Sequence, residues 1–155
     1  MIREATGQDA EAMCALINRI IAIGGTTAHQ APYTPEAIAT YYIDGETTVT
    51  CVVAEVDGAV IGWQAVGWWQ GEPHIGSFVA ADTQAKGVGA QMFSLTRKLA
   101  HKAGLTEIHA SIRADNVPGL AYYARMGFAD YGHDPDFALA DGRVVGRVLR
   151  RFDLA

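Results

Sequence analysis

The sequence predicts an α/β domain in which helices flank a mixed β-sheet, and two observations indicate this fold class. Two runs rich in β-branched residues, at positions 48–56 and 59–69, are separated by Asp57-Gly58, which is a strong signal for a β-hairpin. After the hairpin, segments with helical spacing alternate with strand-like segments. A sheet that combines a hairpin with such an alternation is expected to be mixed.

The composition indicates one globular domain over residues 1–155. Of the 155 residues, 50% are hydrophobic and 19% are charged, which fits a chain with a proper core. The formal net charge is −5 and no basic stripe is visible, which argues against a nucleic-acid partner. The sequence shows neither a signal-peptide pattern nor an apolar run of membrane-spanning length, so we expect a cytoplasmic protein without a membrane partner. Cys14 and Cys51 form no close pair, and we expect buried, reduced thiols.

The first elements are predicted from capping residues. We expect a short strand over residues 2–5 and then a helix whose start is marked by the capping-box spacing of Thr6 and Asp9. The apolar face of this helix contains Met13, Leu16, Ile17 and Ile20. The pair Gly24-Gly25 is expected to end it.

A second short helix and three strands should follow. Thr34-Pro35-Glu36 supplies an N-cap, a proline at the first helical position and an acidic first turn, so this helix should run through Tyr42. The two hairpin strands come next, and a polar break at 70–73 leads to a third strand over 74–80. The hairpin tryptophans are expected to pack, although one of them could line a substrate pocket. They are Trp63, Trp68 and Trp69.

The second half alternates helices and strands. A helix should follow Gly87, because Val88, Met92, Leu95 and Leu99 have helical spacing. A strand is predicted over 106–113 and a second helix within 114–127, capped by Asp115 or Asn116 and ended by Gly127. The segments 128–132 and 143–154 supply the last strands.

Two glycines, Gly87 and Gly89, stand where a strand turns into a helix. A helix N-terminus has free amides and a partial positive charge, and glycine lets an anionic ligand approach them closely. The stretch lacks the lysine and spacing of a P-loop. It also lacks the third glycine of a dinucleotide-binding fingerprint, since Met92 stands there, and Glu107 begins its strand instead of ending it. A nucleotide-dependent oxidoreductase is therefore disfavoured.

The surrounding residues resemble the GNAT acetyltransferases. The stretch "VAADTQAKGVG" at 79–89 is similar to the family's pyrophosphate-binding motif V-x-P-x-x-[RQ]-x-x-G-x-[GA], with Ala81 in place of the common proline. The stretch "NVPGLAYYARMGF" at 116–128 resembles the second signature, N-x-x-[AGS]-x-x-x-Y-x-x-x-G-F. The region 24–42 looks more distantly like the phosphinothricin-type branch. Together the two motifs and the elements between them span positions 79–128, about a third of the chain.

The resemblance implies acetyl-CoA as co-substrate and a GNAT-like sheet with splayed central strands. The residues expected to contact acetyl-CoA lie at the helix opening, on the third strand and at the second signature: Gln84, Lys86, Gly87, Val88, Gly89, Ala90, Phe78, Val79 and Asn116. In the family, the pantetheine arm pairs with the strand edge near Phe78 as an added strand. Asn116 is equally well placed as a plain helix N-cap. No metal is expected, because the five histidines show no metal-ligand spacing.

Acetyl transfer to an amine requires proton transfers at two points. The resemblance implies that Tyr123 is the general acid for the departing thiolate, whereas a core aromatic is the alternative interpretation. The phosphinothricin-type branch has a glutamate five residues before the valine that matches Val79, and this chain has His74 there. Glu72 lies two residues earlier on the same strand face and is the second candidate base. Loss of the amine proton to solvent remains a third interpretation.

The sequence thus favours an acetyl-CoA-dependent N-acetyltransferase that acts on a primary amine of a small molecule or amino-acid-like compound. Acetylation of a protein N-terminus or lysine is an alternative. A non-catalytic acyl-CoA-binding regulatory domain is a second alternative, which would need neither Tyr123 nor a base. The sequence leaves a homodimer open.

Overall fold

A seven-stranded open sheet runs through the molecule in the order β1-β2-β3-β4-β5-β7-β6. The computed structural model describes residues 1–27, 29–81 and 87–154. The strands are β1 (Ile2–Glu4), β2 (Thr48–Val56), β3 (Ala59–Trp69), β4 (Glu72–Val79), β5 (Glu107–Arg113), β6 (Ala129–Asp134) and β7 (Arg147–Asp153). The helical elements are η1 (Gly7–Asp9), α1 (Ala10–Ile23), α2 (Pro35–Ile38), η2 (Ala39–Ile43), α3 (Val88–Lys102) and α4 (Val117–Met126). The predicted α/β class with a mixed sheet is confirmed.

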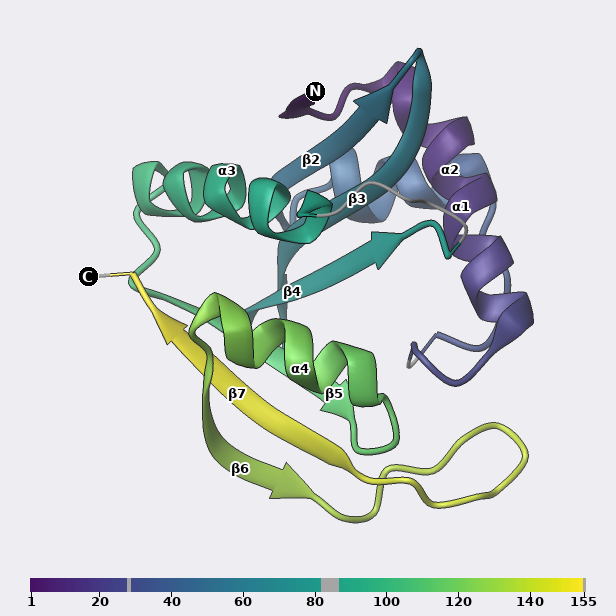
Figure 1. Cartoon of the computed structure of the whole chain (residues 1–155), viewed down its shortest axis with the longest axis vertical. Coiled ribbons are helices and arrows are strands. Elements are labelled where there is room, and N and C mark those ends of the chain that lie inside the picture. Colours follow the sequence, from purple (N-terminus) through teal and green to yellow (C-terminus); the bar gives the residue numbers. More distant parts are fainter. Residues whose placement is uncertain (28, 82–86, 155) are drawn as a thin grey trace.

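Helices cover both faces of the sheet, with α3 and α4 on one side and α1 and α2 on the other (Figure 1). Alternation along the strands produces this arrangement. Val53 on β2 packs in the cluster around α1, whereas its neighbour Val52 packs with Met92 of α3. Trp63 on β3 is fully buried on the α1 side, and its indole nitrogen donates to the Met13 carbonyl at 3.2 Å. The other hairpin tryptophans, Trp68 and Trp69, are 45% and 48% exposed and lie outside the core, and the Trp69 ring packs against His74.

Two tight turns set the positions of β2, β3 and β4. Asp57 and Gly58 both have positive φ angles, of 51° and 79°, and the hairpin predicted there is confirmed. Gln70 and Gly71 form a second turn of the same kind, with φ angles of 51° and 80°. Because this turn takes only two residues, β4 begins at Glu72, two residues before the predicted start.

The central strands β4 and β5 diverge. They run parallel with one registered pair, His74 opposite His109, while β5 pairs with β7 along its whole length. Beyond His74, β4 therefore separates from β5 and its edge opens into a fork. The predicted splay of the central strands is confirmed.

Two elements differ in detail from the prediction. The Thr34 hydroxyl caps the second helix, accepting from the Ala37 amide at 3.1 Å, but after Ile38 the chain continues as the π-helical turn η2. The last strand begins at Arg147 instead of position 143, because Gly146 adopts a φ of 72° that interrupts the extended backbone.

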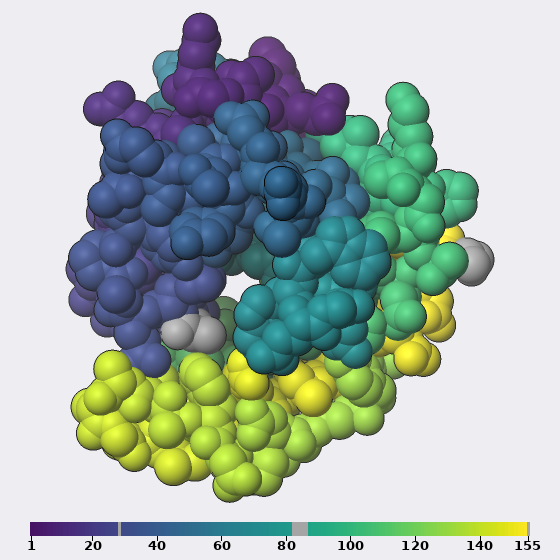
Figure 2. Space-filling view, turned by 180° about the vertical axis from the view of Figure 1, so that it is seen from behind, coloured from purple at the N-terminus to yellow at the C-terminus, as the bar shows by residue number. Residues whose placement is uncertain are grey.

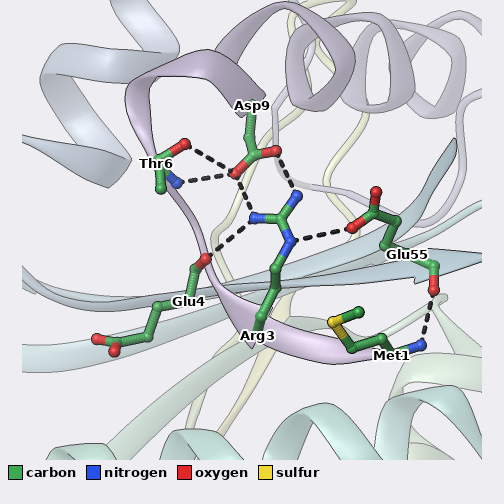
Figure 3. A network of polar contacts seen from close by, with 6 residues as sticks. All are labelled: Met1, Arg3, Glu4, Thr6, Asp9 and Glu55. Carbon is green, nitrogen blue, oxygen red and sulfur yellow. Dashed lines mark hydrogen bonds and ion pairs between the residues drawn. The ribbon is translucent and has the colours of Figure 1, made fainter. Parts of the chain in front are cut away.

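A charged network holds β1 against the start of the first helix (Figure 3). The Arg3 guanidinium donates to both carboxylate oxygens of Asp9, at 2.8 and 2.9 Å, and to Glu55 on β2 at 3.0 Å. The Asp9 carboxylate also accepts from the Thr6 amide at 2.8 Å, as the predicted capping box requires. Hydrogen bonds from Arg3, and more weakly from Thr6, hold the pKa of Asp9 below its ordinary value, although burial opposes them.

This network should make stability depend on acidic pH. A carboxyl whose pKa is depressed by folding contributes stability above its unfolded pKa of about 3.9, and this contribution is lost as pH falls through the folded value. We expect Asp9→Ala to lower the free energy of unfolding at neutral pH by about 1.5–3 kcal/mol. Urea denaturation should show the deficit shrinking towards about pH 3. The exposed Glu46→Ala is the control, and an equal Asp9→Ala deficit at both pH values would contradict an ionic origin.

Candidate functional site

A cavity of about 680 Å³ lies in the fork between β4 and β5. Its walls come from both faces of the sheet, with α1 on one side and α4 on the other. They include Ile20, Thr27, His29, Phe78, Gly89, Arg113, Asn116, Tyr122 and Tyr123. Figure 2 shows an opening on one face, between the blue segment around α2, the teal β3–β4 turn and the yellow-green loop that follows β6. A ligand in the fork can therefore be reached from either side of the sheet.

The N-terminus of α3 borders one side of the cavity. Gly87 is its N-cap with a left-handed φ of 81°, and the first helical hydrogen bond runs from the Gln91 amide to the Gly87 carbonyl at 3.0 Å. The amides of Val88, Gly89 and Ala90 precede that bond, and the first amides of a helix are the ones that an anion site uses. The predicted contacts at Gln84 and Lys86 lie outside the described residues.

Gly89 is a position where a side chain does not fit. A Cβ built there would lie 2.6 Å from Cε1 of Tyr122. The Tyr122 ring is fixed in place because its hydroxyl donates to the Gly89 carbonyl at 2.7 Å and accepts from Gln64 at 3.0 Å. The second glycine of the predicted turn is therefore required by close packing of α4 against the start of α3.

A buried polar network reaches the cavity through Tyr123. The hydroxyls of Tyr123 and Ser77 are 2.9 Å apart, and Ser77 accepts from the Gln64 amide at 2.8 Å. Because Ser77 accepts from Gln64, its own proton can be given to the Tyr123 oxygen, which leaves the Tyr123 proton free to point into the cavity. Tyr122 has no such freedom, since its proton is committed to Gly89.

Burial raises the pKa of Tyr123, and the hydrogen bond from Ser77 opposes this only in part. Burial likewise raises the pKa of Tyr122. Both phenols are therefore protonated at neutral pH. Of the two, Tyr123 is the one whose proton can be given to a ligand.

Two hydrogen bonds beside the cavity link the loop after α1 to the end of β5 and to the N-cap of α4. The Asn116 side chain donates to the Thr26 carbonyl at 2.9 Å, and Arg113 at the end of β5 donates to the Thr27 carbonyl at 3.0 Å. Asn116 also caps α4, accepting from the Gly119 amide at 3.0 Å. The N-cap interpretation of Asn116 is therefore correct, and the same residue lines the cavity.

His29 lines the cavity on the α1 side of the sheet. It lies in the loop between α1 and α2, half-buried, 6.1 Å from the Phe78 ring. Its Nδ1 is 2.9 Å from the Tyr33 hydroxyl and its Nε2 is 3.4 Å from the Tyr42 hydroxyl. Burial lowers the pKa of His29, so the imidazole is neutral at neutral pH.

The predicted bases His74 and Glu72 lie where the fork closes. Nε2 of His74 is 3.4 Å from a Glu72 carboxylate oxygen, and the His74 ring packs against Trp69 and His109. Burial and the neighbouring His109 lower the pKa of His74, while Glu72 opposes them. The two residues share the face of β4 that carries Phe78, as predicted, but neither is among the residues that line the cavity.

The sequence interpretation missed three residues that line the cavity, Ser77, His29 and Arg113, and it also missed Gln64, which donates to Ser77. Ser77 had a usable signal, because it is the polar residue that faces the Tyr123 side of a strand already predicted to bind a ligand. Gln64 is a fully buried amide in an apolar strand, which also marks it as unusual. His29 has no such signal, since it lies in a loop without periodicity.

The structure places the N-terminus of α3 beside a strand fork and the two adjacent tyrosines of α4, and the sequence comparison assigns this arrangement to the acyl-transfer enzymes. The sequence profile described as the Acetyltransferase (GNAT) family matches residues 19–128. The chain belongs to the GNAT acetyltransferase family and is an acetyl-CoA-dependent N-acetyltransferase.

Known relatives agree with this assignment. YwnH of Bacillus subtilis (strain 168), provisionally named a phosphinothricin acetyltransferase, is 28% identical over 96% of this chain and 98% of its own length. A solved structure provisionally named a phosphinothricin N-acetyltransferase is 26% identical, with a TM-score of 0.85, over 100% of this chain and 98% of its own. The phosphinothricin acetyltransferase of Sinorhizobium meliloti, solved with acetyl-CoA, is 18% identical to this chain, with a TM-score of 0.85. The match covers 100% of this chain and 88% of that protein.

Two further features concern only the part of the chain that the structure describes. Within it, the helices are too short or too polar to cross a membrane. Among the described residues there is no group of three or more His, Cys, Asp or Glu side chains that could hold a metal ion.

Proposed function

We propose that the enzyme acetylates a primary amine on a small molecule or amino-acid-like compound. The observation that carries this proposal is the single cavity volume that spans the β4–β5 fork, with the α3 N-terminus on one face and the His29 side on the other. Two substrates can then enter from opposite faces and meet between the strands. The acidic chain, with a net charge of −5, is consistent with a substrate other than nucleic acid.

The α3–α4 side of the cavity suits acetyl-CoA, which supplies the activated acetyl group. The amides of Val88, Gly89 and Ala90 at the start of α3 can bind its diphosphate, with Gln84 and Lys86 as predicted further contacts. The open edge of β4 at Phe78 and Val79 can pair with the amide-rich pantetheine arm. Asn116 lines the same cavity from the cap of α4.

Tyr123 is proposed to donate the proton that the departing thiolate needs. A free thiol has a pKa of about 8.5, so a thiolate that leaves into a buried site gains from a nearby donor. Tyr123 is only 8% exposed, lines the cavity and has a proton that Ser77 can direct into it. This arrangement also favours an enzyme over a non-catalytic acyl-CoA-binding domain.

The other side of the fork favours a small substrate over a protein. The walls there are the apolar Ile20 and Phe78 together with His29, and the Thr26 and Thr27 carbonyls are held across the fork by Asn116 and Arg113. A protein N-terminus or lysine would have to enter between these residues. His74 and Glu72 remain the bases that the sequence predicts.

The first test is binding of acetyl-CoA. We expect acetyl-CoA at 100 times its Kd to stabilise the fold by about 2.7 kcal/mol, because a ligand that binds only the folded state shifts the unfolding equilibrium. Differential scanning fluorimetry with acetyl-CoA measures this shift, with NAD as the control ligand. A screen of amines, amino acids and peptides that follows release of free CoA thiol then identifies the second substrate. Stabilisation by NAD but not by acetyl-CoA would contradict the proposal, and turnover with peptides alone would favour the protein-directed alternative.

A further inference from the structure

We propose that His29 accepts the proton of the amine substrate, a role that rests on the proposed function. Three features of its position carry this inference. His29 lines the cavity at the fork, its ring lies beside Phe78 at 6.1 Å, and it approaches from the face of the sheet opposite Tyr123. A proton acceptor and a proton donor thus face one another across the place where the two substrates meet.

The hydrogen bonds of His29 select the nitrogen that is free to act. Nδ1 is 2.9 Å from the Tyr33 hydroxyl, and that hydroxyl is 3.3 Å from the hydroxyl of Tyr42. In a chain in which Nδ1–H donates to Tyr33 and Tyr33 donates to Tyr42, the Tyr42 proton is directed at Nε2 of His29. Nε2 then carries the lone pair, and its remaining contact, to Tyr42, is long at 3.4 Å. The tyrosine pair therefore orients the ring with Nε2 as the base.

The groups that face His29 do not oppose this role. Tyr33 precedes α2 and Tyr42 belongs to η2, and burial raises the pKa of Tyr42, so its hydroxyl is uncharged at neutral pH. On β5, Arg113 lines the same cavity, and Asp115 accepts two hydrogen bonds from it at 2.9 and 2.8 Å. Asp141 and Arg143, in the loop after β6, line a neighbouring hollow with His29 and pair with one another at 3.3 Å. The cavity residues from α1, Ile20 and Ile23, carry no charge.

The proton balance of the reaction needs one acceptor and one donor. The ammonium substrate gives a proton to Nε2 of His29, and the freed lone pair forms the C–N bond as the C–S bond of the thioester breaks. Tyr123 protonates the departing thiolate, and the second proton lost by the amine nitrogen restores the Tyr123 hydroxyl. The proton on His29 leaves to solvent, so one proton is released per turnover.

His29 is separated from His74, the base predicted by the sequence, because His74 lies where β4 and β5 are still paired. His74 forms the last registered pair between β4 and β5 and contacts Glu72, Trp69 and His109. The β4 residues after His74, at positions 75–79, line the cavity together with His29, and the Phe78 ring lies 6.1 Å from the His29 ring. The burial that lowers the pKa of His29 keeps its imidazole neutral in the free enzyme at neutral pH.

The test is the pH dependence of kcat/KM in His29→Gln, with an amine substrate from the thiol-release screen. The wild-type enzyme should show an acidic limb below pH of about 6.5 and a plateau above it. In His29→Gln we expect a loss of about 100-fold or more at neutral pH. The plateau should be replaced by a rate that rises about tenfold per pH unit, because only the deprotonated fraction of the amine can then react. Stabilisation by acetyl-CoA should be unchanged.

Three further variants make the result decisive. His101→Gln, exposed on the last turn of α3, is the matched control and should keep the wild-type profile. Tyr33→Phe keeps the tyrosine ring but removes the hydroxyl that accepts from Nδ1–H of His29, so the acidic limb should move to lower pH. This variant tests the inference even if His29→Gln does not fold. An acidic limb that persists in His29→Gln but disappears in His74→Gln would overturn the inference and assign the base to His74. Failure of the wild-type enzyme to acetylate any amine would instead overturn the proposed function.

Discussion

Replacing Tyr123 with phenylalanine should lower kcat by about 10²–10⁴-fold while acetyl-CoA still stabilises the fold. The ring of Tyr123 packs against Phe128 and Tyr122, and phenylalanine preserves this packing. Only the hydroxyl is lost, and its hydrogen bond to Ser77 is replaced by no new contact. Because the proton is needed when the thiolate departs, the loss should fall on kcat and leave binding nearly intact.

Single-turnover kinetics with product analysis measures the effect, and a thermal shift with acetyl-CoA measures binding. Tyr41→Phe, in which the altered side chain is 60% exposed on η2, is the matched control. Tyr122→Phe distinguishes the two adjacent tyrosines of α4. If Tyr122→Phe lowered kcat far more than Tyr123→Phe, Tyr122 would be the donor. A wild-type kcat in both Tyr122→Phe and Tyr123→Phe would mean that these tyrosines have only a structural role.

Local sequence signals predicted most of the fold because its turns and caps are made by neighbouring residues. Asp57-Gly58 specifies a two-residue turn by itself, and Thr34 caps its own helix. The turn at Gln70-Gly71 was read as a longer polar break because glutamine seldom takes a positive φ. The π-helical turn η2 has no comparable local signal in the sequence.

The site was only partly predictable because half of it depends on long-range contacts. The glycine turn and Tyr123 belong to motifs with defined spacing, so their positions could be predicted. The contact between Arg113 and the Thr27 carbonyl joins residues 86 positions apart, and only the folded chain brings them together. The same holds for His29, which reaches the cavity because the loop after α1 is tied to β5 and α4.

His74 shows how far strand periodicity can take a functional prediction. Alternation placed His74, Glu72 and Phe78 on one face of β4. It could not show at which residue β4 leaves β5, because a splay depends on both strands and on what lies between them. The fork opens just beyond His74, so the residue that matches the branch's glutamate position lies at the closed end.

The tight contact at Gly89 predicts the largest effect on ligand binding. In Gly89→Val, the new Cβ would lie 2.6 Å from Cε1 of Tyr122. The ring cannot move away without losing its hydrogen bonds to the Gly89 carbonyl and Gln64, so the start of α3 must shift instead. The amides that are proposed to bind the diphosphate shift with it. We therefore expect acetyl-CoA binding to weaken by at least about 100-fold.

At a concentration of 100 times the wild-type Kd, acetyl-CoA should stabilise the wild-type protein by about 2.7 kcal/mol, and Gly89→Val by about 0.4 kcal/mol or less. Gly7→Ala is the matched control, because a Cβ there would meet only Asp44 Oδ2, at 3.9 Å. The double variant Gly89→Ala/Tyr122→Ala separates the two possible causes. Removing the ring should restore part of the stabilisation if the clash with Tyr122 displaces the helix end. No recovery would mean that the added methyl group itself blocks the ligand, and full stabilisation of Gly89→Val would contradict a diphosphate site at the start of α3.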